Sequence, residues 1–368
     1  MSNLEPLARA RWSSARAQAW WDDQPWICGF NFLPSTAVNF LEMWHPESFD
    51  APTIRRELGW AARIGFNALR TNLPFTVWQH DRDALLDEIE QFLAIAAELK
   101  LACVLCLFDD CEFSGAAPVY GPQAAPVPGV HNSRATGSPG RQTVVDHRQR
   151  GALEAYVRSV TGRFGGDQRI LFWDLYNEPG NPLIFGPGGY SRFAADLERH
   201  SLDLMTETFR WAREMAPVQP LTVAAWHVPN AADTADAAYA TPADQTALAL
   251  SDITTFHAYV PRDRALQLIE QLRPLDRPML NTEWLARTVD SRIDDQLEIY
   301  RDAKIGAFQW GLVQGRSQTH HSWPPQVLDP AAMHAGSDDW FHDLLRPDGT
   351  PYRPAEVALI QKLTAAAE

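Results

Sequence analysis

Short apolar runs alternate along this chain with longer segments in which apolar residues recur every three or four positions. The apolar runs are rich in β-branched and aromatic residues, which is typical of buried strands. We place eight strands, at residues 27–31, 66–70, 102–108, 170–176, 221–226, 251–257, 278–283 and 305–310.

The segments between these strands have the period of an amphipathic helix. Leu85 and Ile89 fall on one face of such a helix, and Leu204 and Thr208 on one face of another. Asp81 stands where it would cap the first of these helices.

Eight strands, most of them followed by a helix, predict an α/β fold, the (β/α)₈ or TIM barrel. No linker or shift in composition divides the sequence. We therefore expect one catalytic domain over residues 1–368, with residues 1–26 as an N-terminal extension.

Two segments interrupt the alternation, residues 111–147 after the third strand and residues 312–351 after the eighth. The first is rich in Pro, Gly, Ser and Ala. The second carries a set of ring side chains: His320, His321, Trp323, His334 and Trp340. Loops this long are uncommon unless they have a function, and loops that follow barrel strands rise from the active-site face. Alternatively, both segments are solvent-exposed loops without a function.

Two of the predicted strands end in a glutamate. The fourth runs into Asn177-Glu178-Pro179, and the seventh ends at Glu283. Either residue alone could be a surface carboxylate or a helix cap. Together, at the carboxyl ends of two strands of one barrel, they would form the pair of carboxylates that glycoside hydrolysis requires.

At these residues the chain resembles the clan A glycoside hydrolases, family 5 in particular, over residues 27–359. The resemblance implies that Glu178 is the acid/base and Glu283 the nucleophile of a retaining enzyme. It also implies that Asn177 binds the 2-hydroxyl group of the sugar.

Four more residues match positions of that family. Arg70 would lie beside the nucleophile, and Tyr259, in His257-Ala-Tyr259, would orient it. Trp310 would form the floor under the reacting sugar. The alternatives are a surface ion pair for Arg70, a core histidine for His257 and barrel packing for Trp310.

The end of the third strand departs from the family pattern. Many members have a histidine there, whereas this chain has Asp109, which we expect to contact the sugar. Further substrate contacts are expected from Trp44, Trp226, His227 and Trp323.

Composition narrows the possible partners. The formal charge of −14 gives no electrostatic basis for binding nucleic acid or an anionic membrane, and no apolar run is long enough to span one. The N-terminus lacks the pattern of a signal peptide, and four cysteines without a disulfide pattern are typical of a reducing compartment, so we expect a cytoplasmic protein. The sequence makes no prediction of oligomeric state.

A metal site or a cofactor is not expected. Cys103 and Cys106 lie three apart on a strand, so their side chains point to opposite faces, and we expect buried small side chains there.

The resulting hypothesis is a retaining β-glycoside hydrolase that acts on short β-linked oligosaccharides without a cofactor. Gluco-, manno- and xylo-configured sugars are all compatible with these residues. A transglycosylase of the same fold and a non-catalytic carbohydrate-binding barrel are the alternatives.

Overall fold

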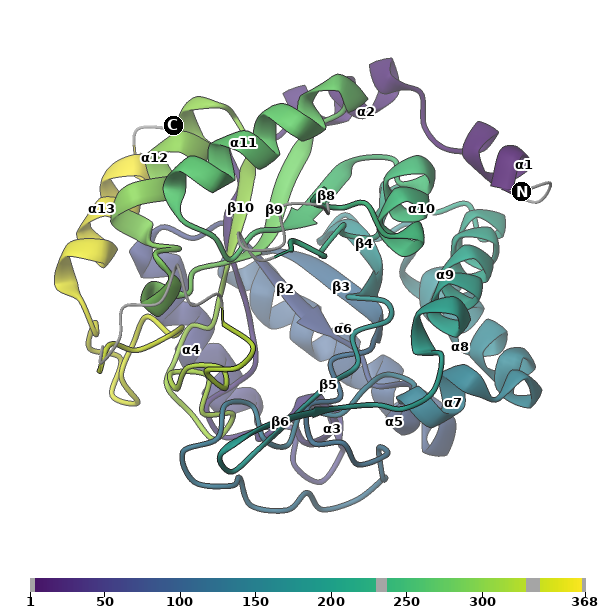
Figure 1. Ribbon diagram of the computed structural model, residues 1–368, viewed down its shortest axis with the longest axis horizontal. Helices are drawn as coiled ribbons and strands as arrows, with labels where there is room; N and C mark the ends of the chain where they lie inside the picture. Colours follow the sequence, from purple (N-terminus) through teal and green to yellow (C-terminus); the bar gives the residue numbers. More distant parts are fainter. Residues whose placement is uncertain (1–3, 230–236, 329–337, 366–368) are drawn as a thin grey trace.

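Eight parallel strands form the centre of the molecule in a computed structural model that describes residues 4–229, 237–328 and 338–365. They are β1 (Cys28–Asn31), β2 (Ala68–Asn72), β3 (Ala102–Asp109), β4 (Ile170–Asn177), β7 (Leu221–Thr222), β8 (Thr254–His257), β9 (Met279–Trp284) and β10 (Gly306–Trp310). Their order in the sheet is β7-β4-β3-β2-β1-β10-β9-β8. An isolated parallel bridge joins Ala225, three residues after β7, to Phe256 of β8. The sheet is therefore a nearly closed barrel, which confirms the predicted fold (Figure 1).

Helices surround the barrel (Figure 1). Those that follow the strands are α4 (Ala51–Ile64), α6 (Arg82–Glu98), α8 (Arg150–Phe164), α9 (Leu197–Glu214), α10 (Pro242–Leu250), α11 (Arg262–Leu272), α12 (Ile293–Asp302) and α13 (Pro354–Ala365). Shorter helices are α1 (Leu4–Arg9), α2 (Ser14–Asp22), α3 (Phe40–Trp44), α5 (Phe75–His80) and α7 (Arg141–Val145). None of the helices in the described part of the chain is long and apolar enough to cross a membrane.

The predicted helical period matches the packing. In α6, Leu85 and Ile89 are fully buried, and the Asp81 side chain accepts a hydrogen bond from the backbone N–H of Ala84 at 3.0 Å, which confirms the cap. In α9, Leu204 and Thr208 are also fully buried.

The fifth strand is shorter than predicted. Regular pairing ends at Thr222, and side chains accept from two of the backbone N–H groups that follow. Ser251 accepts from the N–H of Val223 at 3.0 Å, and Asp244 accepts from the N–H of Trp226 at 2.8 Å. A hairpin of β5 (Leu183–Gly186) and β6 (Gly189–Arg192) follows β4 and was not predicted from the sequence.

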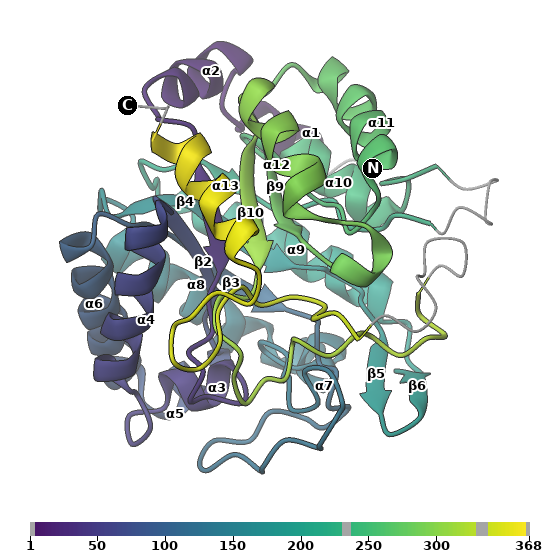
Figure 2. The same ribbon diagram turned by 90° about the vertical axis from the view of Figure 1, so that its left-hand side faces the viewer.

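One end of the barrel is closed by apolar side chains. Phe172 and Phe308 meet edge to face inside it, with ring centres 6.1 Å apart. Trp12 and Trp21, from the N-terminal segment, pack against the same cluster. A side-chain carbon at Gly29 would lie 2.5 Å from the Phe308 ring, so only glycine fits there. In Figure 2, α2 lies at this end, whereas α7 and the β5–β6 hairpin lie at the other.

Candidate active site

Glu178 and Glu283 meet at the carboxyl ends of the strands. An oxygen of one side chain lies within 4.8 Å of an oxygen of the other. Glu178 directly follows β4 and has a φ of +44°, in the left-handed region that a non-glycine residue rarely adopts. The turn that holds it is fixed by Asp110, whose carboxylate accepts from the N–H of Gly180 at 2.7 Å.

Glu283 is surrounded by strong donors. Arg70 Nη1 donates to its Oε1 at 2.9 Å, and the Tyr259 hydroxyl donates to its Oε2 at 2.9 Å. Both contacts were predicted from the sequence. They favour a carboxylate that carries its negative charge.

Arg70 is a fully buried hub. Its Nε donates to Asp174 at 2.8 Å, and its Nη2 donates to Asn177 at 2.7 Å. Burial opposes the charge on Arg70, but the carboxylates of Asp174 and Glu283 outweigh it and raise its pKa. The guanidinium is therefore a fixed cation that connects three strands.

Glu178 has weaker, uncharged partners. Its Oε2 accepts from Asn181 Nδ2 at 2.7 Å and from the Cys111 thiol at 3.1 Å, and its Oε1 lies 2.9 Å from His257 Nδ1. Burial lowers the pKa of His257 to about 4 and raises the pKa of Cys111, so the imidazole is neutral and the thiol keeps its proton.

Burial raises the pKa of both glutamates above that of a free glutamate. Two carboxylates this close do not both ionise readily, so the pair titrates as a unit that shares one proton. Within the described part of the chain, Glu283 contacts a fixed cation and Glu178 does not, which favours the negative charge on Glu283 and the proton on Glu178.

Asp109 positions Asn177. Its Oδ1 accepts from Asn177 Nδ2 at 2.9 Å, and its Oδ2 accepts from Asn72 at 2.9 Å. Both its oxygens are thus engaged by the protein, although the residue still borders the cavity in front of the glutamates.

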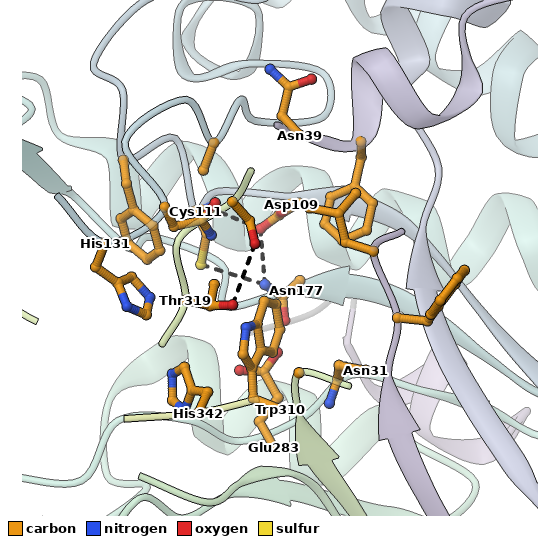
Figure 3. A pocket seen from close by; sticks show the side chains of 18 of the residues that line it. Asn31, Asn39, Asp109, Cys111, His131, Asn177, Glu283, Trp310, Thr319 and His342 are labelled. Carbon is orange, nitrogen blue, oxygen red and sulfur yellow. Dashed lines mark hydrogen bonds between the residues drawn. The ribbon is translucent and has the colours of Figure 1, made fainter. Parts of the chain in front are cut away.

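That cavity, which we call the loop-side cavity, lies between the two long loops. Figure 3 shows Asn31, Asp109, Asn177, Glu283 and Trp310 around it. The loop at 111–147 contributes Cys111, Phe113, His131, Asn132, Ala135 and Thr136, and the loop at 312–351 contributes Leu312, Val313, Ser317, Thr319, Trp323, His342 and Asp343. Both loops border the mouth, as predicted. His334 lies outside the described residues.

A second cavity, the hairpin-side cavity, adjoins the first. It is lined by Trp226 and His227, by Leu183 and Phe185 of β5, and by Arg264 of α11. Both cavities share one set of residues: Phe113, Glu178, Tyr259 and Trp323. Glu178 therefore lies where the two cavities meet.

Trp44 was predicted to contact the substrate, and this prediction is wrong. It has no exposed surface, it lines neither cavity, and its indole N–H donates to the carbonyl of Asn72 at 2.9 Å. Its ring packs against Phe49 and Phe92, so it belongs to the core and not to the site. An aromatic residue after the first strand can either pack in the core or bind substrate, and its position in the sequence does not distinguish the two.

Several residues of the site were not identified from the sequence. Asp174 gave a signal, since it is a charge within an otherwise apolar strand, and it pairs with Arg70. The contacts of Cys111 and Asn181 left no trace in the sequence pattern, because they depend on how separate loops meet. Asn31, at the end of β1, was also not identified; it accepts from Arg70 Nη1 at 2.8 Å. All four cysteines are unpaired and buried, which agrees with the buried side chains expected at Cys103 and Cys106.

Glu178, His257 and Glu283 could in principle hold a metal ion, since one ligand atom of each lies within 4.8 Å of the others. A cation there would lie beside the Arg70 guanidinium, which already binds Glu283 at 2.9 Å. Like charges repel, so the arrangement fits carboxylate chemistry better than metal binding.

Searches of known protein families and of curated proteins give no match for this sequence. Solved structures do match the fold. GH5_18 from Streptomyces cattleya in complex with GlcNAc is 15% identical, with a TM-score of 0.56 over 93% of this chain and 80% of that one. An endo-1,4-β-mannanase from Rhizomucor miehei is 13% identical, with a TM-score of 0.58 over 93% and 95%.

An exo-β-1,4-mannosidase from Opitutaceae bacterium strain TAV5 is 17% identical, with a TM-score of 0.59 over 93% of this chain and 60% of that one. The barrel is therefore similar in fold to family 5 glycoside hydrolases, the family that the residues of the site resemble.

Proposed function

We propose that this protein is a retaining β-glycoside hydrolase that acts at the end of short β-linked oligosaccharides. The observation that carries the proposal is the pair formed by Glu178 and Glu283, close together but held by different partners. A cation and a phenol hold Glu283 ionised, as a nucleophile requires. Neutral groups hold Glu178, as suits a residue that must gain and lose a proton.

The reaction has two displacements. First, a Glu283 oxygen attacks the anomeric carbon while Glu178 gives its proton to the departing glycosidic oxygen, which leaves a covalent glycosyl ester on Glu283. Glu178, now ionised, then removes a proton from a water molecule, whose oxygen attacks the same carbon and releases Glu283. Two inversions give net retention.

The spacing of the glutamates supports retention over inversion. Inverting enzymes keep their carboxyl groups about 6.5–9.5 Å apart to admit a water molecule, and retaining enzymes about 5–5.5 Å. A contact within 4.8 Å between oxygens of the two residues is consistent with the shorter class.

Other side chains have supporting roles in this proposal. Asn177, held by Arg70 and Asp109, would donate to the 2-hydroxyl group of the sugar. Trp310 would stack on the sugar bound in the loop-side cavity. Trp226 and His227 line the hairpin-side cavity, where the departing part of the substrate would lie.

A preference for short substrates follows from the wall of the loop-side cavity. The N–H of Asn132 donates to the carbonyl of Ser317 at 2.9 Å, and Gln318 Nε2 donates to the carbonyl of Val127 at 2.8 Å. Asn39 joins the same wall through the carbonyl of Arg134 at 2.8 Å. These bonds connect the two long loops across one side of the site, so a long polymer would meet a closed end.

The test is a panel of aryl β-glycosides of mannose, glucose, xylose and galactose, followed by natural β-linked oligosaccharides. Mannose comes first because two proteins with similar structures are named as a mannosidase and a mannanase. The proposal expects turnover of at least one substrate, release of the β-anomer in early NMR spectra, and mono- or disaccharide products. Early release of the α-anomer would contradict retention, and a rapid fall in the viscosity of a long mannan or β-glucan would contradict action at chain ends.

A further inference from the structure

Three buried side chains of the long loops border the loop-side cavity without bonding to either glutamate. His131, His342 and Asp343 are 3%, 1% and 1% exposed. Figure 3 shows His131 and His342 on the same side of the cavity, with Thr319 nearby. Their ring centres lie 5.2 Å apart, and the ring centre of His342 is 6.3 Å from that of Trp310.

Both histidines present a hydrogen-bond acceptor that has no partner among the described residues. His131 Nδ1 lies 2.7 Å from the carbonyl oxygen of His321, and His342 Nδ1 lies 2.5 Å from that of Leu285. A carbonyl only accepts, so each Nδ1 must carry the proton. Burial lowers the pKa of His131 to about 4 and that of His342 well below its usual value, so both rings are neutral. Each Nε2 is therefore a lone-pair acceptor.

Asp343 adds further acceptor capacity. Its carboxylate has one side-chain donor within the described residues, the Thr319 hydroxyl, which lies 3.1–3.2 Å from its two oxygens. One hydroxyl proton cannot serve both oxygens. Arg287 binds the carbonyl oxygen of Asp343 and not its carboxylate.

The position of that carboxylate is fixed against the floor of the cavity. Gly311, which follows Trp310, has a φ of +79°, and a side-chain carbon there would lie 2.4 Å from Asp343 Oδ1. Glycine is required at this position on both counts. The acidic group is thus held beside the residue that would stack on the sugar.

We propose that His131, His342 and Asp343 form the binding site for the hydroxyl groups of the terminal sugar, and that this site accepts uncharged sugars and rejects uronic acids. The inference rests on the proposed function, since it concerns the same cavity. Sugar hydroxyls can donate to all three acceptors. The carboxylate of a uronic acid would instead face Asp343, and no lysine or arginine is among the described residues that line the cavity.

Binding can be measured without turnover, from the fluorescence change of Trp310 and its neighbours on addition of sugar. The probes are matched pairs: glucose and glucuronate, mannose and mannuronate, galactose and galacturonate. Burial raises the pKa of Asp343 to about 7, so the titrations are done at pH 8, where the group is ionised. The wild type should bind at least one uncharged sugar tenfold or more tightly than its uronate.

Asp343→Asn keeps an acceptor for Thr319 but removes the charge. It should weaken binding of the uncharged sugar tenfold or more, because hydrogen bonds to charged groups are the stronger class. It should also reduce the discrimination against the uronate. The control is Asp348→Asn, an exposed residue of the same loop, which should leave both affinities unchanged.

Equal affinity of the wild type for the two members of every pair would overturn the inference, as would wild-type affinities in folded Asp343→Asn. If that variant does not fold, the wild-type comparison decides alone. Selective binding without hydrolysis of any glycoside would refute the proposed function and leave this site standing. Hydrolysis of a glycoside at the same rate by the wild type and by Asp343→Asn would support the proposed function and refute the role of Asp343 in sugar binding.

Discussion

The two ends of the barrel are built from the same strands but from opposite kinds of side chain. At one end, Phe172 and Phe308 fill the interior under Trp12 and Trp21. Two residues further along β4, on the same face, stands Asp174, which binds Arg70. The apolar end is stabilised by close packing of side chains alone, whereas each buried charge at the polar end also needs an oppositely charged or hydrogen-bonding partner.

The polar end of the barrel is therefore the end where burial of charged groups lowers the stability of the fold. Removing a charge from water is unfavourable unless a partner compensates for it. Arg70, Asp174 and Glu283 are all buried and are held in one connected network. A barrel stabilised only by packing has no use for such a network, so its position indicates the functional end.

The largest effect is expected from Glu283→Ala. In the proposed mechanism no other described side chain is placed to form the covalent intermediate, so kcat/KM should fall on the order of 10⁵-fold, about 7 kcal/mol. Azide added with an activated substrate should enter the space of the lost carboxylate and give a glycosyl azide of inverted configuration. Mass spectrometry and NMR of the product are the measurements.

Glu178→Ala is the companion variant. Substrates with good leaving groups need little protonation, so their first step should survive and azide should give a product of retained configuration. If both variants respond alike to leaving group and to azide, the two roles are wrongly assigned.

The next effect belongs to the apolar end. Phe172→Ala should leave a cavity beside Phe308 and lower the free energy of unfolding by about 3–5 kcal/mol. Denaturant titration measures the loss. The kcat of the folded fraction should stay near that of the wild type, and a large fall in kcat would mean that the two ends are not independent.

Arg70→Lys tests the polar end with the charge preserved. The guanidinium donates through three nitrogens to Asp174, Glu283 and Asn177, which one ammonium group cannot reproduce. We expect kcat/KM to fall about 10²–10³-fold, or about 3–4 kcal/mol.

Arg169→Lys is the matched control. Arg169 binds Asp167 at the beginning of β4, at the apolar end. The kcat and KM of Arg169→Lys should equal those of the wild type. If Arg70→Lys also has near-normal kcat/KM, then Arg70 has only a structural role.

The smallest effect is expected from Cys111→Ala. The thiol donates to Glu178 and so stabilises its ionised form, which lowers its pKa relative to a site without the thiol. Its loss should raise the pKa of Glu178. The basic limb of the kcat/KM profile, where Glu178 loses its proton, should move to higher pH, while the acidic limb stays in place.

Cys111→Ser keeps a donor of similar size and should restore much of the wild-type profile. A basic limb that does not move in Cys111→Ala would exclude the thiol as a partner that tunes Glu178.

The strands and much of the site could be predicted from the sequence, because the spacing of apolar residues along the chain shows which residues are buried. All eight strands lie where apolar runs indicated, and Arg70, Tyr259 and Glu283 make the contacts expected of them. Strand ends are short-range features, and parallel strands bring their ends to one face. The side-chain contacts at that face then follow closely from the register.

What could not be predicted depends on contacts between distant segments. After the short fifth strand, the N–H groups of Val223 and Trp226 bond to the side chains of Ser251 and Asp244, which lie elsewhere in the chain. Trp44 fits a core position or a binding position equally well by residue type. The carboxylate that the Cys111 thiol faces could not be predicted, because it depends on the path of a long loop.

The wall between the long loops has a consequence for how such a protein can change. It is held by backbone carbonyls, by the amide of Gln318 and by Asn39, none of which bonds to either glutamate. Shortening one loop by a few residues would therefore open the site into a groove and leave the carboxylates where they are. In the proposed function, the length of sugar chain that is accepted and the bond-breaking step can thus evolve, or be engineered, separately.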